Sequence, residues 1–257
     1  MARAHHVIVA CLAALLVLLC GAGVRGEVLH VSAFGQPGTY DSIGGAVADA
    51  KDGDTVQIGP GYFVLSAGVV VNDTRVLSIV GSGSGTTFVS AFYLDFFLRM
   101  VHVDGGLAGQ PGGPAFRIAD MAIVETSASA ATAVGGCVIV EGVNAVVENV
   151  MTANTQFTGL STSAASLQLP SEFVGGAAVS VLSAPSFIGR SLDLSFCQTT
   201  NSPGGCIFIF NSSNVVLDTV SITSGAASQG GGIAIVQSSN VSVAGTLTGP
   251  LRACRRM

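Results

Sequence analysis

Acidic side chains are the first residues of this 257-residue chain to consider for catalysis. Asp49, Asp52 and Asp54 form the closest-spaced acidic set. Acid–base hydrolysis of a glycosidic bond needs two carboxyl groups roughly 5–9 Å apart on one face. These aspartates stand where a helical pattern stops, and acidic residues in such places usually end helices and form turns. The pattern therefore favours a structural role for all three.

His102 and Asp104 form the second candidate pair. The alternation of Val101-His102-Val103-Asp104 puts both side chains on one face of a strand, with no third group to complete a site. A surface position is the simpler interpretation. We therefore assign no catalytic residue from the sequence.

Metal, phosphate and nucleic-acid chemistry have no recognisable motif. There is no Cys-x-x-Cys or Cys/His spacing, so we predict no metal and no cofactor. The glycine runs 81–85 and 230–232 precede neither a helix nor Lys-Ser or Lys-Thr, which favours turns over phosphate cradles. Fifteen acidic residues stand against ten basic ones, which argues against nucleic acid as a partner.

Residues 1–26 read as a secretory signal. Arg3 precedes the apolar run Val7–Cys20, and Val24-Arg25-Gly26 is a plausible cleavage site. The run is too short to span a bilayer, and no later segment is long enough. We expect a secreted protein, extracellular or at the cell surface, without a transmembrane segment after signal removal. The remaining chain divides into a main domain, 27–251, and a basic tail, 252–257, which could be the truncated end of a longer chain.

The second half repeats one pattern four times: a glycine pair, then a short apolar strand. The units begin at Gly135, Gly176, Gly204 and Gly230, and the last three are 28 and 26 residues apart. Strand-based repeats of this length are typical of a solenoid, whose units must stack to bury their apolar faces. Overlaying the units predicts stacked interior rows made by Val138, Val140, Val179, Val181, Ile207, Ile209, Ile233 and Ile235.

Strand alternation sends a second apolar set outward. This candidate lateral surface comprises Ile139, Leu182, Phe208, Phe210 and Val236. Such a strip is either covered by the chain itself, for which the insertion between Met151 and Gly175 is the obvious segment, or binds an external partner. The same overlay aligns Glu148, Arg190 and Asp218 as a charge ladder at one corner.

The amino end differs from these repeats. Ile43, Ala46, Val47 and Ala50 give the segment Asp41–Lys51 one apolar face, which predicts a short amphipathic helix that caps the first coil. The chain after Val243 shows no apolar periodicity, so we expect the last coil to lack a comparable cap.

Two stretches carry a family resemblance. The run YDSIGGAVADAKDGDTVQIGPGYF, 40–63, followed by VLSIVGSGSGTTFV, 76–89, resembles the opening of right-handed parallel β-helix proteins of the pectin-lyase-like superfamily. The GGCI and GGGI units are similar to the repeats of chlamydial polymorphic membrane proteins. The resemblance implies an all-β fold: a right-handed parallel β-helix, or solenoid, with a short N-terminal capping helix.

The superfamily includes lyases, hydrolases and esterases as well as non-enzymatic adhesins, so the fold alone assigns no activity. The chain lacks the paired aspartates and Gly-His-Gly of the hydrolases, and its nearest match to an esterase string is Asp95-Phe-Phe-Leu. Arg190 is the one base between Arg117 and Arg252, whereas pectate lyases need an arginine base and an acidic calcium cluster. We favour a non-catalytic module of the cell surface or extracellular matrix that binds polysaccharide or a cell-surface protein. The alternative is a polysaccharide-active enzyme of the pectate lyase or glycoside hydrolase type.

Cysteines and sequons add two further expectations. Four cysteines follow the signal, which allows three pairings, and free thiols are an equal alternative. Cys197 and Cys206 are the best disulfide candidates, because the intervening Asn-Ser-Pro-Gly-Gly can reverse the chain. Cys137 and Cys206 occupy equivalent positions two coils, about 9–10 Å, apart, beyond the roughly 7 Å that a disulfide allows. Sequons at Asn72, Asn211 and Asn240 are candidate glycosylation sites, or ordinary loop residues.

Overall fold

The computed structural model describes residues 26–91, 94, 96–103, 106, 108–125, 127–128, 136–158, 176–200, 204–227 and 231–248. Its elements follow in chain order. They are β1 (Val28–Val31), α2 (Ile43–Asp49), β2 (Thr55–Ile58), β3 (Gly61–Val64), β4 (Val69–Asn72), β5 (Ser78–Val80), β6 (Thr87–Ser90), β7 (Leu98–Val101), β8 (Phe116–Val124), β9 (Ser127–Ala128), β10 (Val138–Glu141), β11 (Ala145–Thr158), β12 (Val179–Leu182), β13 (Phe187–Thr200), β14 (Ile207–Phe210), β15 (Val215–Thr223), β16 (Ile233–Val236) and β17 (Val241–Thr248).

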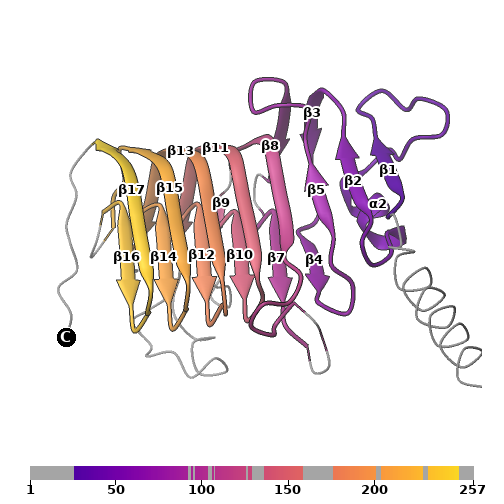
Figure 1. Cartoon of the computed structure of the whole chain (residues 1–257). Coiled ribbons are helices and arrows are strands. Elements are labelled where there is room, and N and C mark those ends of the chain that lie inside the picture. The colour runs from indigo at the N-terminus through magenta and orange to yellow at the C-terminus, as the bar shows by residue number, and fades with distance from the viewer. Residues whose placement is uncertain are drawn as a thin grey trace, which may run out of the picture.

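The strands form a parallel β-helix. One sheet follows the order β1-β2-β5-β8-β11-β13-β15-β17, with β3, β6 and β9 paired off this path, and the second follows β16-β14-β12-β10-β7-β4. Every strand pair among the described residues is parallel, so successive coils lie side by side from the amino end to the carboxyl end (Figure 1). The structure confirms the predicted all-β solenoid with one short helix.

The interior rows have the predicted register. Val138, Val179, Ile207 and Ile233 are direct partners on neighbouring strands, and so are Val140, Val181, Ile209 and Ile235. The first three members of each row are fully buried. Ile233 is half-buried and Ile235 is 37% exposed, because β16 has a strand partner on one side only.

Sharp corners separate the strands within a coil. Thirteen described non-glycine residues have φ between 47° and 59°. They recur at equivalent corner positions: Asp120, Asn149, Ser191 and Thr219 follow the aligned residues Ala119, Glu148, Arg190 and Asp218. Five of the thirteen are asparagine, the residue besides glycine that best tolerates this conformation.

Helix α2 caps the first coil with the predicted face. Ile43, Ala46 and Val47 are buried. The helix is shorter than the predicted segment because Ser42 caps it, accepting a hydrogen bond from Gly45 N, and Ala50 is already extended. Arg75 completes the other end: its Nη1 donates to Ala48 O (3.1 Å) and Ala50 O (2.7 Å), two carbonyl groups of the terminal turn. Within the described ranges, no helix has the length and apolarity to cross a bilayer.

Candidate functional site

The outward apolar residues form a second cluster, separate from the core. Ile139, Leu182, Phe208 and Phe210 are buried and pack with Ala234, and the rings of Phe208 and Phe210 stack at 6.3 Å. Val236 and Phe96 pack against them and are partly buried. These side chains therefore do not form an open lateral surface. The first part of the insertion predicted as their cover belongs to β11, which continues to Thr158, and the rest of it, residues 159–175, lies outside the described part.

The three closely spaced aspartates bind the chain itself. Asp54 is buried and accepts from Glu27 N and Lys51 N, both at 2.7 Å. Asp52 accepts from Val76 N at 2.7 Å, and Asp49 accepts from the Tyr40 hydroxyl at 3.1 Å. Their oxygens stabilise the junction between the cap helix and the first coils, as the turn pattern predicts.

His102 pairs with Asp73, a partner that the sequence analysis missed. His102 Nδ1 lies 2.6 Å from Asp73 Oδ2, while Asp104 lies outside the described residues. The side chain of Asp73 is fully buried and also accepts from Val103 N (2.8 Å) and Gly109 N (3.1 Å). The Asp73 pKa is lowered: burial alone would raise it, but the bonds from His102 and the two backbone groups outweigh that effect.

The loop after β7 leaves little room above this pair. A Cβ atom at Gly106 would lie 1.8 Å from the Asp73 carboxylate, and one at Gly109 would lie 2.2 Å from His102 Nδ1. Asn144 holds the same loop farther along, with its Nδ2 donating to Gln110 O (2.7 Å) and Gly113 O (3.3 Å). A histidine oriented by a buried carboxylate could serve as a general base. Here, among the described residues, no hydroxyl or thiol is hydrogen-bonded to His102, and the pair acts as a clasp for the loop.

Two further ion pairs bridge neighbouring coils. Arg99 Nη2 binds Glu141 at 2.6 Å, and Arg117 Nη2 binds Glu148 at the same distance. The register of the predicted ladder is right, since Glu148, Arg190 and Asp218 are direct partners. The predicted pairing is wrong in detail, because Glu148 turns to Arg117, and no described residue forms an ion pair with Arg190.

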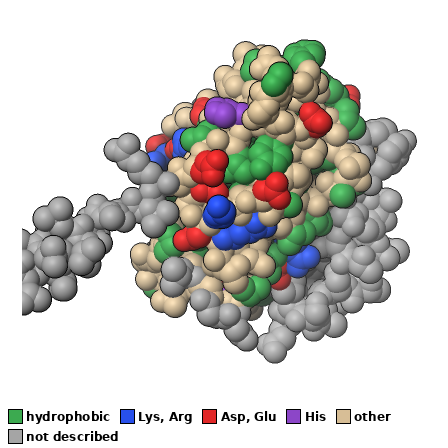
Figure 2. Space-filling view, turned by 90° about the vertical axis from the view of Figure 1, so that its right-hand side faces the viewer, with side chains coloured by type: hydrophobic (Ala, Val, Ile, Leu, Met, Phe, Trp, Pro, Cys, Tyr) green, Lys and Arg blue, Asp and Glu red, His purple; other side chains and the backbone are tan. Residues whose placement is uncertain are grey.

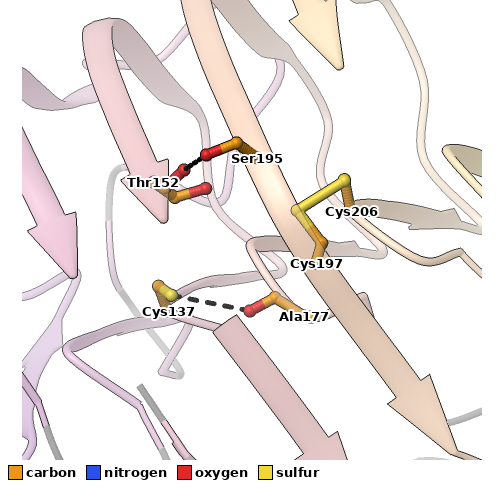
Figure 3. The surroundings of a disulfide bond; sticks show 6 residues. All are labelled: Cys137, Thr152, Ala177, Ser195, Cys197 and Cys206. Atoms are coloured by element: carbon orange, nitrogen blue, oxygen red, sulfur yellow. Dashed lines mark hydrogen bonds between the residues drawn. A yellow bond between two sulfur atoms is a disulfide. The ribbon is translucent and has the colours of Figure 1, made fainter. Parts of the chain in front are cut away.

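Cys197 and Cys206 form a disulfide, with 5.0 Å between their Cα atoms (Figure 3). Cys206 is aligned with Ala178 and Cys137 on the two preceding coils, in agreement with the predicted separation. Cys137 is buried, and its Sγ donates to Ala177 O at 3.5 Å. All three sequon asparagines, Asn72, Asn211 and Asn240, are exposed.

A recess beside β1 and β2, here called the Phe34 pocket, has a volume of about 460 Å³. Phe34 at its rim is 81% exposed. The loop that carries Phe34 is held in place, since Ser32 N donates to Tyr40 O (3.0 Å) and Tyr40 N to His30 O (2.7 Å). The lining residues are His30, Val31, Ser32, Phe34, Gln36, Thr39, Gln57, Gly59, Pro60 and Ser82, with no Asp, Glu, Lys or Arg among them.

The polar side chains of the Phe34 pocket retain hydrogen-bond acceptors. Gln57 Nε2 donates to Gly81 O (3.0 Å), which leaves its Oε1 as an acceptor. The hydroxyls of Ser82 and Thr39 donate to Ile58 O (2.9 Å) and Gln36 O (2.6 Å), which leaves their oxygen lone pairs. The pocket thus combines an exposed aromatic ring with uncharged acceptors, which suits a ligand with an apolar face and hydroxyl groups.

A second recess, here called the helix groove, runs between α2 and residues 62–70 and has a volume of about 400 Å³. Asp41, Ser42 and Arg75 supply polar groups to it, and Tyr62, Val64 and Val70 are its most exposed apolar side chains. Figure 2 views this amino end, where acidic side chains flank a patch of hydrophobic ones and basic side chains lie below it. Neither recess was visible in the sequence, because both form between segments that are distant along the chain.

Comparisons with known proteins add no relatives: no family model, no curated protein and no solved structure matches this chain. No group of three or more His, Cys, Asp or Glu side chains in the described part could hold a metal ion.

Proposed function

We propose that this chain is a secreted, non-catalytic β-helix module of the cell surface or extracellular matrix. It binds carbohydrate in the Phe34 pocket. The resemblance of its opening and repeats to pectin-lyase-like proteins and to polymorphic membrane protein repeats supports an extracellular role of this kind. Non-enzymatic adhesins are one of the classes of protein with this fold, but the fold alone does not assign a protein to any one of these classes.

The observation that carries the proposal is the contrast between the acidic groups and the Phe34 pocket. Asp54, Asp73 and Glu141 are engaged in hydrogen bonds or ion pairs that hold coils and loops together. The Phe34 ring, by contrast, is exposed and has uncharged acceptors around it. Binding pockets combine apolar surface with a few placed polar groups, and this pocket fits a neutral sugar residue whose C–H face lies on the ring.

The proposal is tested by titrating the purified protein with neutral and uronic-acid oligosaccharides in a calorimeter. We expect a neutral sugar to bind and Phe34→Ala to weaken the affinity at least tenfold. Phe196→Ala is the matched control, since Phe196 is 60% exposed on β13, far along the chain from the pocket. Equal losses in both variants, or no binding by any sugar, would contradict the assigned site.

Catalysis is tested separately on uronate polymers with and without calcium, against heat-inactivated protein. The proposal expects no turnover above that control. Turnover that survives Phe34→Ala would favour the polysaccharide-active enzyme instead. The secretory assignment predicts that protein recovered outside the cell begins near Glu27, which amino-terminal sequencing measures.

A further inference from the structure

Strand β3 is an edge strand with an open side. It pairs with β6 alone, and Gly61 N and Leu65 N donate to Thr86 O and Ser90 O, both at 2.9 Å. The backbone groups of alternate residues point to opposite sides of a strand, so those of Tyr62 and Val64 point away from β6. No backbone group among the described residues pairs with them.

The β1 edge at the amino end is covered in part. Tyr40 bridges to Val31 of β1, with Ser32 N donating to Tyr40 O at 3.0 Å. Helix α2 packs on β1, β2 and β4. Proteins usually blunt an open edge with charges, prolines or bulges, because it invites pairing with another chain. Strand β3 instead presents Tyr62 and Val64, which are 52% and 70% exposed.

The helix groove provides space beside this edge. Residues 62–70 form one wall, and α2 with Ser42 and Asp41 forms the other. In a strand added to β3, successive side chains would point to opposite faces of the sheet. One set would point toward the groove, and the other would lie on the face that carries Tyr62 and Val64. The geometry points to β3 as a docking edge for an extended polypeptide segment, which binds by adding a strand to the sheet.

The surrounding charges define the segment further. Asp41 lines the groove, and Glu125 accepts a hydrogen bond from the Tyr62 hydroxyl at 3.1 Å. Arg75 is the one basic lining residue, and its Nη1 is engaged by two carbonyl groups of the α2 terminus. The two carboxylates favour a partner segment that carries basic residues, and the exposed Tyr62 and Val64 side chains favour apolar residues at alternate positions of it. This site shares no lining residue with the Phe34 pocket and goes beyond the proposed function.

The test uses a synthetic probe, acetyl-KVTVTVK-amide carrying a fluorophore, and measures its Kd by fluorescence anisotropy. The diagnostic reagents are two N-methylated versions of the probe, one for each set of alternate amides. Strand addition uses the amides on one edge only, so one version should lose binding more than tenfold and the other should bind like the parent. Equal binding by both versions, or no binding by the parent probe, would overturn the proposal.

Variants of the protein locate the contact. Val64→Pro removes an edge N–H without touching the bonds to β6, and Val64→Lys adds a repulsive charge; each should weaken the Kd at least tenfold. Val216→Lys is the matched control, because Val216 is an exposed valine (38%, against 70% for Val64) on β15, which has strands on both sides. A probe with glutamate in place of lysine should bind more weakly, and oligosaccharide binding should be the same in all three variants. Unchanged probe binding in Val64→Pro, with its thermal unfolding unaltered, would refute the assignment of β3.

Discussion

The solenoid has an irregular amino-terminal half and a regular carboxyl-terminal half built from the repeat units. Different interactions hold the two halves together. All three ion pairs in the described part, Asp73–His102, Arg99–Glu141 and Arg117–Glu148, lie before residue 149. The later coils use aliphatic rows and ladders of neutral side chains, such as Asn240 Nδ2 donating to Asn214 Oδ1 at 3.1 Å. The three pairs have two settings. Asp73–His102 holds a connecting loop, in which Asp73 also accepts from Val103 N and Gly109 N, whereas Arg99–Glu141 and Arg117–Glu148 join neighbouring strands.

The largest effect should come from a charge in the regular half. Ile209→Asp puts a carboxylate at a fully buried position between Val181 and Ile235, where an unpaired charge costs about 3–5 kcal/mol. We expect a large fall in Tm or loss of soluble protein. Val216→Asp is the control, because that side chain is 38% exposed. Thermal unfolding followed by circular dichroism measures both, and equal Tm values would disprove the register.

The disulfide should rank next. Its cysteines are nine residues apart, and closing a loop of that length removes entropy from the unfolded chain equivalent to about 3 kcal/mol. Cys197→Ala combined with Cys206→Ala should therefore lower the free energy of unfolding by about that amount. Reductant should destabilise the parent protein and leave the double variant unaffected. A parent protein insensitive to reductant would show that the bond contributes nothing.

The irregular half should respond to acid through Asp73. Its pKa is lowered in the folded state, so its stabilising effect is present above the ordinary aspartate pKa of about 4 and is lost as the pH falls through the lowered value. Asp73→Asn should cost about 1–3 kcal/mol at pH 7. The variant should also lose part of the decline in stability below about pH 4. Urea unfolding at several pH values measures this, with the exposed Asp49→Asn as control. An acid response identical to that of the parent would mean that Asp73 does not titrate as described.

A stabilising change is predicted at one polar residue within the interior rows. Thr152 is fully buried between Ile123 and Leu194, and its hydroxyl has no hydrogen-bond partner among the described residues. Thr152→Val keeps the shape and removes the unpaired group, so it should raise the free energy of unfolding by about 1 kcal/mol. Thr86→Val is the control, since the exposed Thr86 hydroxyl donates to Gly83 O at 3.2 Å. Destabilisation by Thr152→Val would reveal a partner for that hydroxyl.

The smallest predicted effects on stability are those of substituting two arginines, Arg117 and Arg190. Arg117→Gln breaks an ion pair that is partly exposed, which is worth at most about 1 kcal/mol. Arg190→Gln should change stability less, because no described residue forms an ion pair with Arg190. Urea unfolding at low and high salt should show a salt-dependent loss for Arg117→Gln alone. A larger loss for Arg190→Gln would restore the predicted ladder.

Much of the regular half could be predicted because strand periodicity is local. Val179 and Ile207 each lie three residues after a repeat glycine, at Gly176 and Gly204, so overlaying the units yields both register and facing. The irregular half offered no such overlay. His102 was paired with Asp104, two residues away, whereas the fold brings Asp73 to it from the preceding coil, 29 residues earlier.

The sequence alone thus determined the solenoid, its cap helix and the inward rows, because each depends on side-chain spacing within one or two elements. It also indicated the disulfide, where a short turn separates the two cysteines. Only the tertiary structure decided the Asp73–His102 clasp, the burial of Phe208 and Phe210, the helix groove and the Phe34 pocket. Each of these depends on which residues of different coils come to lie next to one another, and loops of irregular length hide that alignment from the sequence.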